Sequence, residues 1–179
     1  MISFRLALRE DISELERLIP LSVRTLQAGS YTSDQMDGAL GSVFAVDSQL
    51  IRDGTYFVAE AKGAIVGCGG CSRRKTMFGG DTMKVCEDLL LDPMKDPARI
   101  RAFFVRPGWE RKGIGSEIMR LCEGAVLKAG FGRIEIVATL VGEHLYAKFG
   151  YSVVERYDVA LKNGHALPVV RMQKGLCHA

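Results

Sequence analysis

The second half of this sequence contains a strand-helix-strand pattern that restricts the fold more than any other feature. Apolar residues dominate Arg99 to Val105 and Arg133 to Ala138, which predicts two strands. Between them, apolar residues recur at helical spacing from about Gly113 to Lys128, and Gly130 suits the position after a helix end. Two strands joined by a helix in this order predict a right-handed crossover between parallel strands of one sheet.

The other predicted strands are short apolar or alternating runs that end at turn residues. They are Ile2 to Leu8, Thr55 to Glu60, Ile65 to about Arg73, Val153 to Leu161 and Leu167 to Met172. Lys62-Gly63 and Asn163-Gly164 predict tight hairpins between neighbouring strands. Since hairpin strands are antiparallel, we expect an α/β fold with a mixed, mostly antiparallel central sheet and helices on both faces.

Capping residues mark the helices of the first half. Asp11 with Glu14 predicts a helix over residues 11–27, which Pro20 should kink or divide. Thr32 with Gln35 predicts a short second helix.

Two further segments complete the predicted organisation. A short helix is expected from about Glu143 to Phe149, where Gly150 ends it. Residues 75–98 have no clean periodicity and predict a long excursion, and excursions of this length in a compact domain are usually functional or mobile.

Length and composition set the outer limits. Residues 1–179 contain no repeat or linker and suffice for one domain with a continuous core. The net charge of +3 is too small to indicate a nucleic-acid partner. No apolar run approaches the roughly 20 residues that span a bilayer, and no signal-peptide pattern is present. We therefore expect a cytoplasmic protein with no membrane partner and with its five cysteines reduced.

A glycine-rich basic loop lies between the predicted strand 99–105 and the helix that follows. Backbone amides at a helix N-terminus are unpaired, and glycines allow a phosphate to approach them closely. The candidate pyrophosphate site consists of Arg111, Lys112, Gly113, Ile114, Gly115 and Ser116. A dinucleotide fingerprint requires glycine where Ile118 stands, and in a P-loop the lysine follows the glycine instead of preceding it.

The loop resembles the coenzyme A loop of the GNAT N-acetyltransferase superfamily, (Gln/Arg)-x-x-Gly-x-(Gly/Ala). Glu110 departs from that pattern, although Arg111 and Lys112 keep the loop basic. Leu145-Tyr146-Ala147-Lys148-Phe149-Gly150-Tyr151 is similar to a second stretch of the family, with Tyr146 at the position near the coenzyme A sulfur. Thr139 stands where many members have asparagine.

This resemblance implies acetyl-CoA as cosubstrate and a small-molecule or protein amine as acceptor, which attacks the thioester directly in a ternary complex. Backbone amides around Phe104 and Val105 would polarise the acetyl carbonyl, and Tyr146 would protonate the departing thiolate. Homodimers are common in the family. The alternative is a non-catalytic acyl-CoA-binding or sensor module of the same fold, and no motif specifies the acceptor.

The sequence contains no obvious base for the amine. Glu135 in a predicted strand, with Glu87 and Asp88 in the excursion, are the carboxylates to consider, but each is more typical of a surface group, and water can relay the proton. Cys68-Gly69-Gly70-Cys71 predicts buried thiols and a glycine bulge. It does not predict a metal site, because no second ligand pair has suitable spacing. By resemblance only, Tyr31 and Thr32 are expected on the acceptor side.

Overall fold

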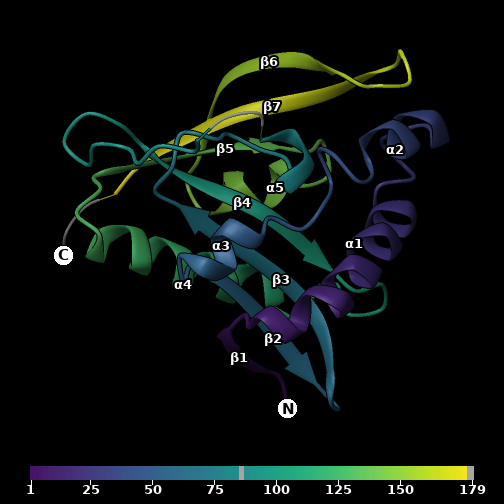
Figure 1. The fold of residues 1–179 in the computed structure, drawn as a ribbon, viewed down its shortest axis with the longest axis horizontal. Helices are drawn as coiled ribbons and strands as arrows, with labels where there is room; N and C mark the ends of the chain where they lie inside the picture. Colours follow the sequence, from purple (N-terminus) through teal and green to yellow (C-terminus); the bar gives the residue numbers. More distant parts are fainter. Residues whose placement is uncertain (85–86, 177–179) are drawn as a thin grey trace.

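The computed structural model describes residues 1–84 and 87–176, and their strands form one seven-stranded sheet in the order β1-β2-β3-β4-β5-β7-β6 (Figure 1). The strands are β1 (Ser3–Leu6), β2 (Tyr56–Ala61), β3 (Ala64–Ser72), β4 (Ala98–Val105), β5 (Arg133–Ala138), β6 (Ser152–Ala160) and β7 (Ala166–Gly175). The helices are α1 (Ile12–Leu26), α2 (Ser33–Ala39), α3 (Ser48–Arg52), α4 (Ile114–Lys128) and α5 (Glu143–Lys148), with 3-10 turns η1 (Arg9–Asp11) and η2 (Asp81–Met83).

The pairing of the strands confirms the predicted mixed sheet. Strands β4 and β5 are parallel and joined through α4, whereas the other neighbouring pairs are antiparallel. The parallel pairing is short, because the register joins only Ala98 to Ile134 and Arg99 to Glu135. Beyond these residues β4 and β5 share no further pair within the described chain, which leaves a gap between them toward their carboxyl ends.

Helices lie on both faces of the sheet (Figure 1), and each face carries a hydrophobic cluster. One cluster contains the buried residues of α1, α2 and α3 together with Phe104 of β4. The other contains those of α4 and α5 together with Ile100 of β4 and Ile136 of β5. Side chains alternate between the two faces of a strand. Since Ile100 and Ile136 face α4 and α5, their neighbours Arg99 and Glu135 face the helices α1 to α3.

The start of the first helix differs from its prediction. Asp11 is the N-cap residue of α1, but the capping pair with Glu14 is wrong: the Asp11 carboxylate accepts from Arg5 and from the Leu8 amide, whereas Glu14 accepts from the amide of Ile65 on β3. Of the two effects predicted for Pro20, a kink or a division, the division is absent. The buried face of α1, which includes Leu15, Leu18, Ile19 and Val23, packs onto the sheet and holds the helix together across the missing amide.

Local signals placed most other elements within a residue or two. The capping box of Thr32 and Gln35 is confirmed. The predicted end of α4 at Gly130 is also confirmed, since this glycine has φ of 86°, in the left-handed region. The turn Lys62-Gly63 has φ of 52° and 74°, as a tight hairpin requires. Helix α3 was not predicted, since its five residues are too few to show a helical period.

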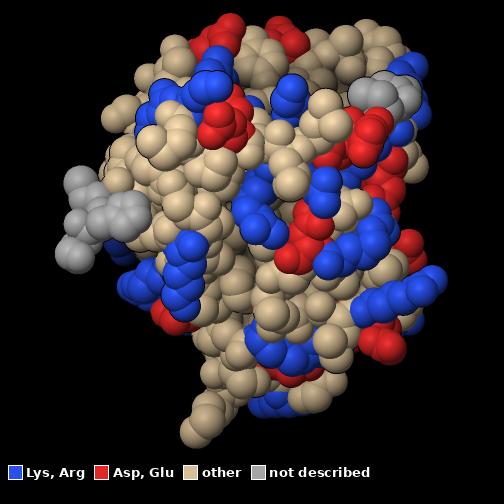
Figure 2. All heavy atoms as spheres, turned by 60° about the vertical axis from the view of Figure 1, so that its left-hand side comes forward, with Lys and Arg blue, Asp and Glu red and all other residues tan. Residues whose placement is uncertain are grey.

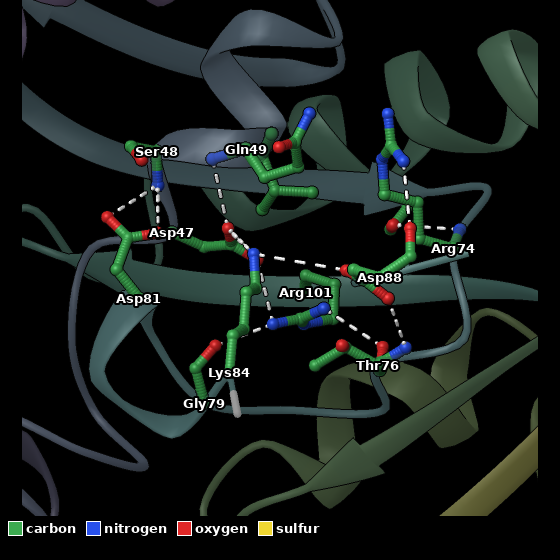
Figure 3. Close-up of polar contacts among 12 residues, drawn as sticks. Asp47, Ser48, Gln49, Arg74, Thr76, Gly79, Asp81, Lys84, Asp88 and Arg101 are labelled. Atoms are coloured by element: carbon green, nitrogen blue, oxygen red, sulfur yellow. Dashed lines mark hydrogen bonds and ion pairs between the residues drawn. The ribbon is translucent and has the colours of Figure 1, made fainter. Parts of the chain in front are cut away.

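Buried charges attach the excursion after β3 to the rest of the fold (Figure 3). Arg101 of β4 and Asp47 before α3 are each at most 2% exposed and form an ion pair of 2.8 Å. Arg101 also donates to the carbonyl oxygens of Thr76 and Gly79, at 2.9 and 2.5 Å. Lys84 of the excursion donates to the same Asp47 carboxylate. The segment is therefore anchored through its backbone to a cation that cannot reach water.

We expect Asp47→Ala to lower the free energy of unfolding by about 3–5 kcal/mol, because it leaves the Arg101 guanidinium buried and unpaired. Asp37→Ala is the matched control, since Asp37 pairs with Arg24 at the surface, with side chains 52% and 54% exposed, and such pairs contribute about 1 kcal/mol or less. Urea denaturation of both variants measures the difference. Equal losses would contradict the buried network.

Candidate active site

The loop between β4 and α4 presents its backbone amides to solvent at the start of the helix. Gly113 is the N-cap residue with φ of 83°, in the left-handed region, and Arg111 has φ of 61°. Glu117 donates to the Gly113 carbonyl at 2.9 Å. Within the described chain, the amides from Glu110 to Ser116 have no acceptor. Together with the helix dipole, these free amides form a site suited to an anion.

The predicted loop residues divide into exposed and buried groups. Arg111, Lys112 and Gly113 are exposed, and the Lys112 Nζ lies 4.4 Å from the centroid of the Trp109 ring. Ile114 is 2% exposed. A Cβ on Gly67 of β3 would lie 2.5 Å from its Cγ2 atom. Ile114 therefore holds the start of α4 against the sheet, and its contribution to an anion site is limited to its backbone amide.

Gly115 and Ser116 lie one step further along α4. A Cβ on Gly115 would lie 3.1 Å from Leu145 of α5, so glycine permits the close approach of these two helices. Both residues are less exposed than Arg111 and Lys112, which precede the helix.

The amides of Phe104 and Val105, the two predicted donors of β4, point in opposite directions. The Phe104 amide points toward β3, where the Cys68 thiol lies within hydrogen-bonding reach of it. The amide of Arg106, two residues on, also points toward β3 and donates to Val66 at 2.9 Å. Successive amides of a strand alternate in direction, so that of Val105 points away from β3. It therefore faces the gap between β4 and β5. Phe104 contributes its ring to the core, 6.1 Å from Phe44.

Tyr146 lies beside this gap on the α4–α5 face. It is 4% exposed, and its ring packs edge-on against Phe103 of β4 at 6.1 Å and Tyr151 at 5.9 Å. Its hydroxyl has no hydrogen-bond partner among the described residues. Burial, with a smaller effect of Cys122, raises the pKa of Tyr146, so the phenol stays protonated at neutral pH.

The predicted carboxylate bases have other partners. Glu135 is 2% exposed, and its carboxylate accepts from Arg99, from Arg171 at 2.9 Å and from Gln173 at 3.0 Å. Both oxygens of this carboxylate are therefore occupied by donors. Asp88 accepts from the amide of Thr76 at 2.9 Å.

Tyr31 and Thr32 have structural partners. The Tyr31 hydroxyl donates to the Pro168 carbonyl on β7 at 2.7 Å and accepts from the amide of Leu140 after β5 at 3.0 Å. It thereby ties the α1–α2 connection to both strands. Thr32 caps α2, and Thr139 accepts from the amide of Gly142 at 3.1 Å.

The cysteine pair of β3 has the predicted structural role. Cys68 and Cys71 are buried free thiols, and the register with β4 shifts between Cys68 and Gly70. Among the described residues, no group of three or more His, Cys, Asp or Glu side chains is arranged to hold a metal ion. Cys86 and Cys177 lie outside the described residues.

The parted strands, the amide-rich loop and the helix that it begins define an acyl-coenzyme A acyltransferase fold. The model of the acetyltransferase (GNAT) family matches residues 21–151, and the chain belongs to this family. That membership supports acetyl-CoA-dependent acetyltransferase activity in general terms. No curated protein matches the sequence significantly.

Solved structures share the fold at low sequence identity. The GCN5-related N-acetyltransferase of Rhodopseudomonas palustris is 19% identical, with a TM-score of 0.71, over 97% of this chain and 95% of that one. The PaiA N-acetyltransferase of Thermoplasma acidophilum, solved with coenzyme A, is 14% identical with a TM-score of 0.65, over 98% and 99% of the two chains. YncA of Salmonella typhimurium, a putative acetyltransferase solved with acetyl-CoA, is 15% identical with a TM-score of 0.65, over 99% and 95%.

Sequence reasoning missed the arginines of β4 and β7 that face the α1–α3 side. Arg99 and Arg101 alternate with apolar residues in a strand that is buried on both faces. Arg171 lies on β7, across β5 from them, and contacts Glu135. Arginine inside an apolar strand is costly without a partner, and that was the available signal.

No helix of the described residues is long and apolar enough to cross a membrane.

We expect Gly113→Ala to weaken coenzyme A binding roughly tenfold. A Cβ in the left-handed region costs about 1–2 kcal/mol, so the loop shifts and its amides lose their alignment. Gly124→Ala in the same helix is the control: its Cβ would meet nothing within 4 Å, so coenzyme A affinity should be retained. Titration calorimetry compares the two variants. Unchanged affinity in Gly113→Ala, and also in Arg111→Ala, would remove the loop from the site.

Proposed function

We propose that this chain is an N-acetyltransferase that transfers the acetyl group of acetyl-CoA to an amine by direct attack in a ternary complex. The observation that carries the proposal is the gap between β4 and β5. The amide-rich loop lies beyond the end of β4, the Val105 amide faces the gap, and Tyr146 packs beside it. We further propose a cytoplasmic location, with no nucleic-acid or membrane partner. A homodimer remains a prediction.

The loop suits the pyrophosphate of the cosubstrate. The amides of Gly113 to Ser116 are free donors, the exposed Arg111 and Lys112 add positive charge, and a Cβ on Gly113 would meet nothing within 4 Å, which leaves room for a ligand. We assign the phosphates to these amides because an anion at a helix N-terminus is stabilised by both the donors and the dipole.

Bound acetyl-CoA supplies the acetyl group as an activated thioester. The amide of Val105 would donate a hydrogen bond to the carbonyl oxygen, where negative charge develops during attack. A donor fixed by the sheet needs no reorganisation during the reaction. The fold therefore supplies this stabilisation through backbone geometry, and the identity of the side chain at 105 is secondary.

Tyr146 would donate its proton to the departing thiolate. Its raised pKa keeps the hydroxyl protonated at neutral pH, so the phenol has a proton to donate when the thiolate departs. The Phe103 and Tyr151 rings fix the position of the phenol. The amine would lose its proton to water, because Glu135 is held by its three donors.

We expect Tyr146→Phe to lower kcat by about 100-fold, the lower end of the range for general acid catalysis, with little change in coenzyme A affinity. Tyr151→Phe is the matched control, because the partners of its hydroxyl are the Met119 sulfur, at 3.6 Å, and the Glu123 carboxylate of α4. Thiol release at saturating acceptor measures both variants. Unchanged kcat in Tyr146→Phe would remove the acid role.

The alternative is a non-catalytic acyl-CoA sensor of the same fold. Thiol release from acetyl-CoA with a library of amines separates the two functions. Release that depends on an amine supports the enzyme, whereas coenzyme A binding without any such release supports the sensor.

A further inference from the structure

An open pocket of about 380 Å³ lies on the α1–α3 face, where the gap between β4 and β5 begins. Its lining residues come from four strands and the excursion: Arg99, Glu135, Arg171, Glu155, Tyr157 and Met77. Arg99 and Glu135 are the last paired residues of β4 and β5, so the pocket adjoins the gap in which we place the thioester. Its size is that of a small-molecule site.

The inner wall of this pocket contains two cations and one anion. Arg99 and Arg171 share the single carboxylate of Glu135, whose two oxygens accept from one arginine each. Glu155 lies at the rim, with a side chain 54% exposed, 3.7 Å from Arg171, whose side chain is 33% exposed. The inner wall therefore has a net charge of +1, and Glu155 at the rim brings the whole lining to zero. Figure 2 shows basic and acidic side chains interspersed over one face of the molecule.

Both arginines of the pocket retain a guanidinium nitrogen without a partner. Arg99 donates through its Nη1 atom to Pro97 and Glu135, and Arg171 donates through its Nε atom to Glu135. The Nη2 atoms of Arg99 and Arg171 and the Tyr157 hydroxyl have no hydrogen-bond partner among the described residues. A ligand with anionic oxygens would supply acceptors for these donors.

We propose that this pocket binds the acceptor, and that the acceptor is a small amine carrying a carboxylate held by Arg99 and Arg171. The assignment rests on the proposed acetyltransferase function. A guanidinium matches a carboxylate through two parallel hydrogen bonds. The surplus of one positive charge on the inner wall fits a monoanion, and Glu155 at the rim disfavours a dianion such as phosphate.

The excursion forms one wall of the same pocket. Met77 lies between Thr76 and Gly79, and Arg101 holds this stretch through the carbonyl oxygens of Thr76 and Gly79. Arg101 neighbours Arg99 on the same face of β4. Acceptor binding and the attachment of the excursion thus depend on adjacent arginines of one strand.

Matched acceptor pairs test the proposal on the unmodified protein. Initial rates of thiol release are measured with β-alanine, 4-aminobutanoate and 6-aminohexanoate, and with the amide of each. We expect kcat/KM to be at least about tenfold higher for the best carboxylate than for its amide, mainly through KM, which corresponds to one hydrogen-bonded ion pair. Amides that react as well as the carboxylates overturn the carboxylate proposal and leave the acetyltransferase function intact. No release with any amine overturns both.

Arg171→Gln tests the residue. Glu135 keeps Arg99 and Gln173 in this variant, so the fold retains its buried pair. We expect the preference for carboxylate over amide to collapse toward unity. Arg156→Gln is the control, because Arg156 lies on the neighbouring strand β6 but pairs with Glu143 of α5, at 2.6 Å. An undiminished preference in Arg171→Gln overturns the assignment. If that variant does not fold, the acceptor pairs alone decide.

Discussion

The parting of β4 from β5 immediately after Arg99 and Glu135 is the constraint on which the rest of this structure depends. A bulge in the β3–β4 pairing accompanies it: Ala102 has φ of 54°, and the register shifts between Cys68 and Gly70. Bulges increase the local twist of a strand and redirect it. The Tyr56 hydroxyl donates to the Ala102 carbonyl at 3.1 Å and so holds this left-handed residue in place. Without the parting, the Val105 amide would lie inside a ladder, unavailable to a ligand.

Glycines of β3 make the parting compatible with a packed core. A Cβ on Gly69 would lie 2.6 Å from the Phe103 ring, and a Cβ on Gly70 would lie 2.7 Å from Tyr56. Together with Gly67 beneath Ile114, these positions allow three large side chains to reach the strand. The rings of Phe103 and Tyr146 then pack beside the gap. The segment between the two buried cysteines is therefore part of the site's support, although it has no chemistry of its own.

The positions of the strands along the chain could be predicted from the sequence because the signals for them are local. The strand-helix-strand pattern, the capping box at Thr32 and the turn glycines 63 and 164 depend on neighbouring residues only. The partners of charged groups depend on the whole fold. Asp11, Glu14 and Glu135 therefore acquired contacts that no spacing indicates. The direction of the Val105 amide required the register of β3, and the pocket required four strands, so neither was readable from the chain.

A crystal structure with bound coenzyme A tests the central claim most directly. We predict pyrophosphate oxygens on the amides of Gly113 to Ser116, with the sulfur in the gap between β4 and β5 beside Tyr146. A second pocket, lined by Ile2 and Phe4 of the β1 region with Lys112 and Gly113 of the loop, offers a contrasting location. Coenzyme A bound there, with the gap free of its thiol arm, would contradict the account.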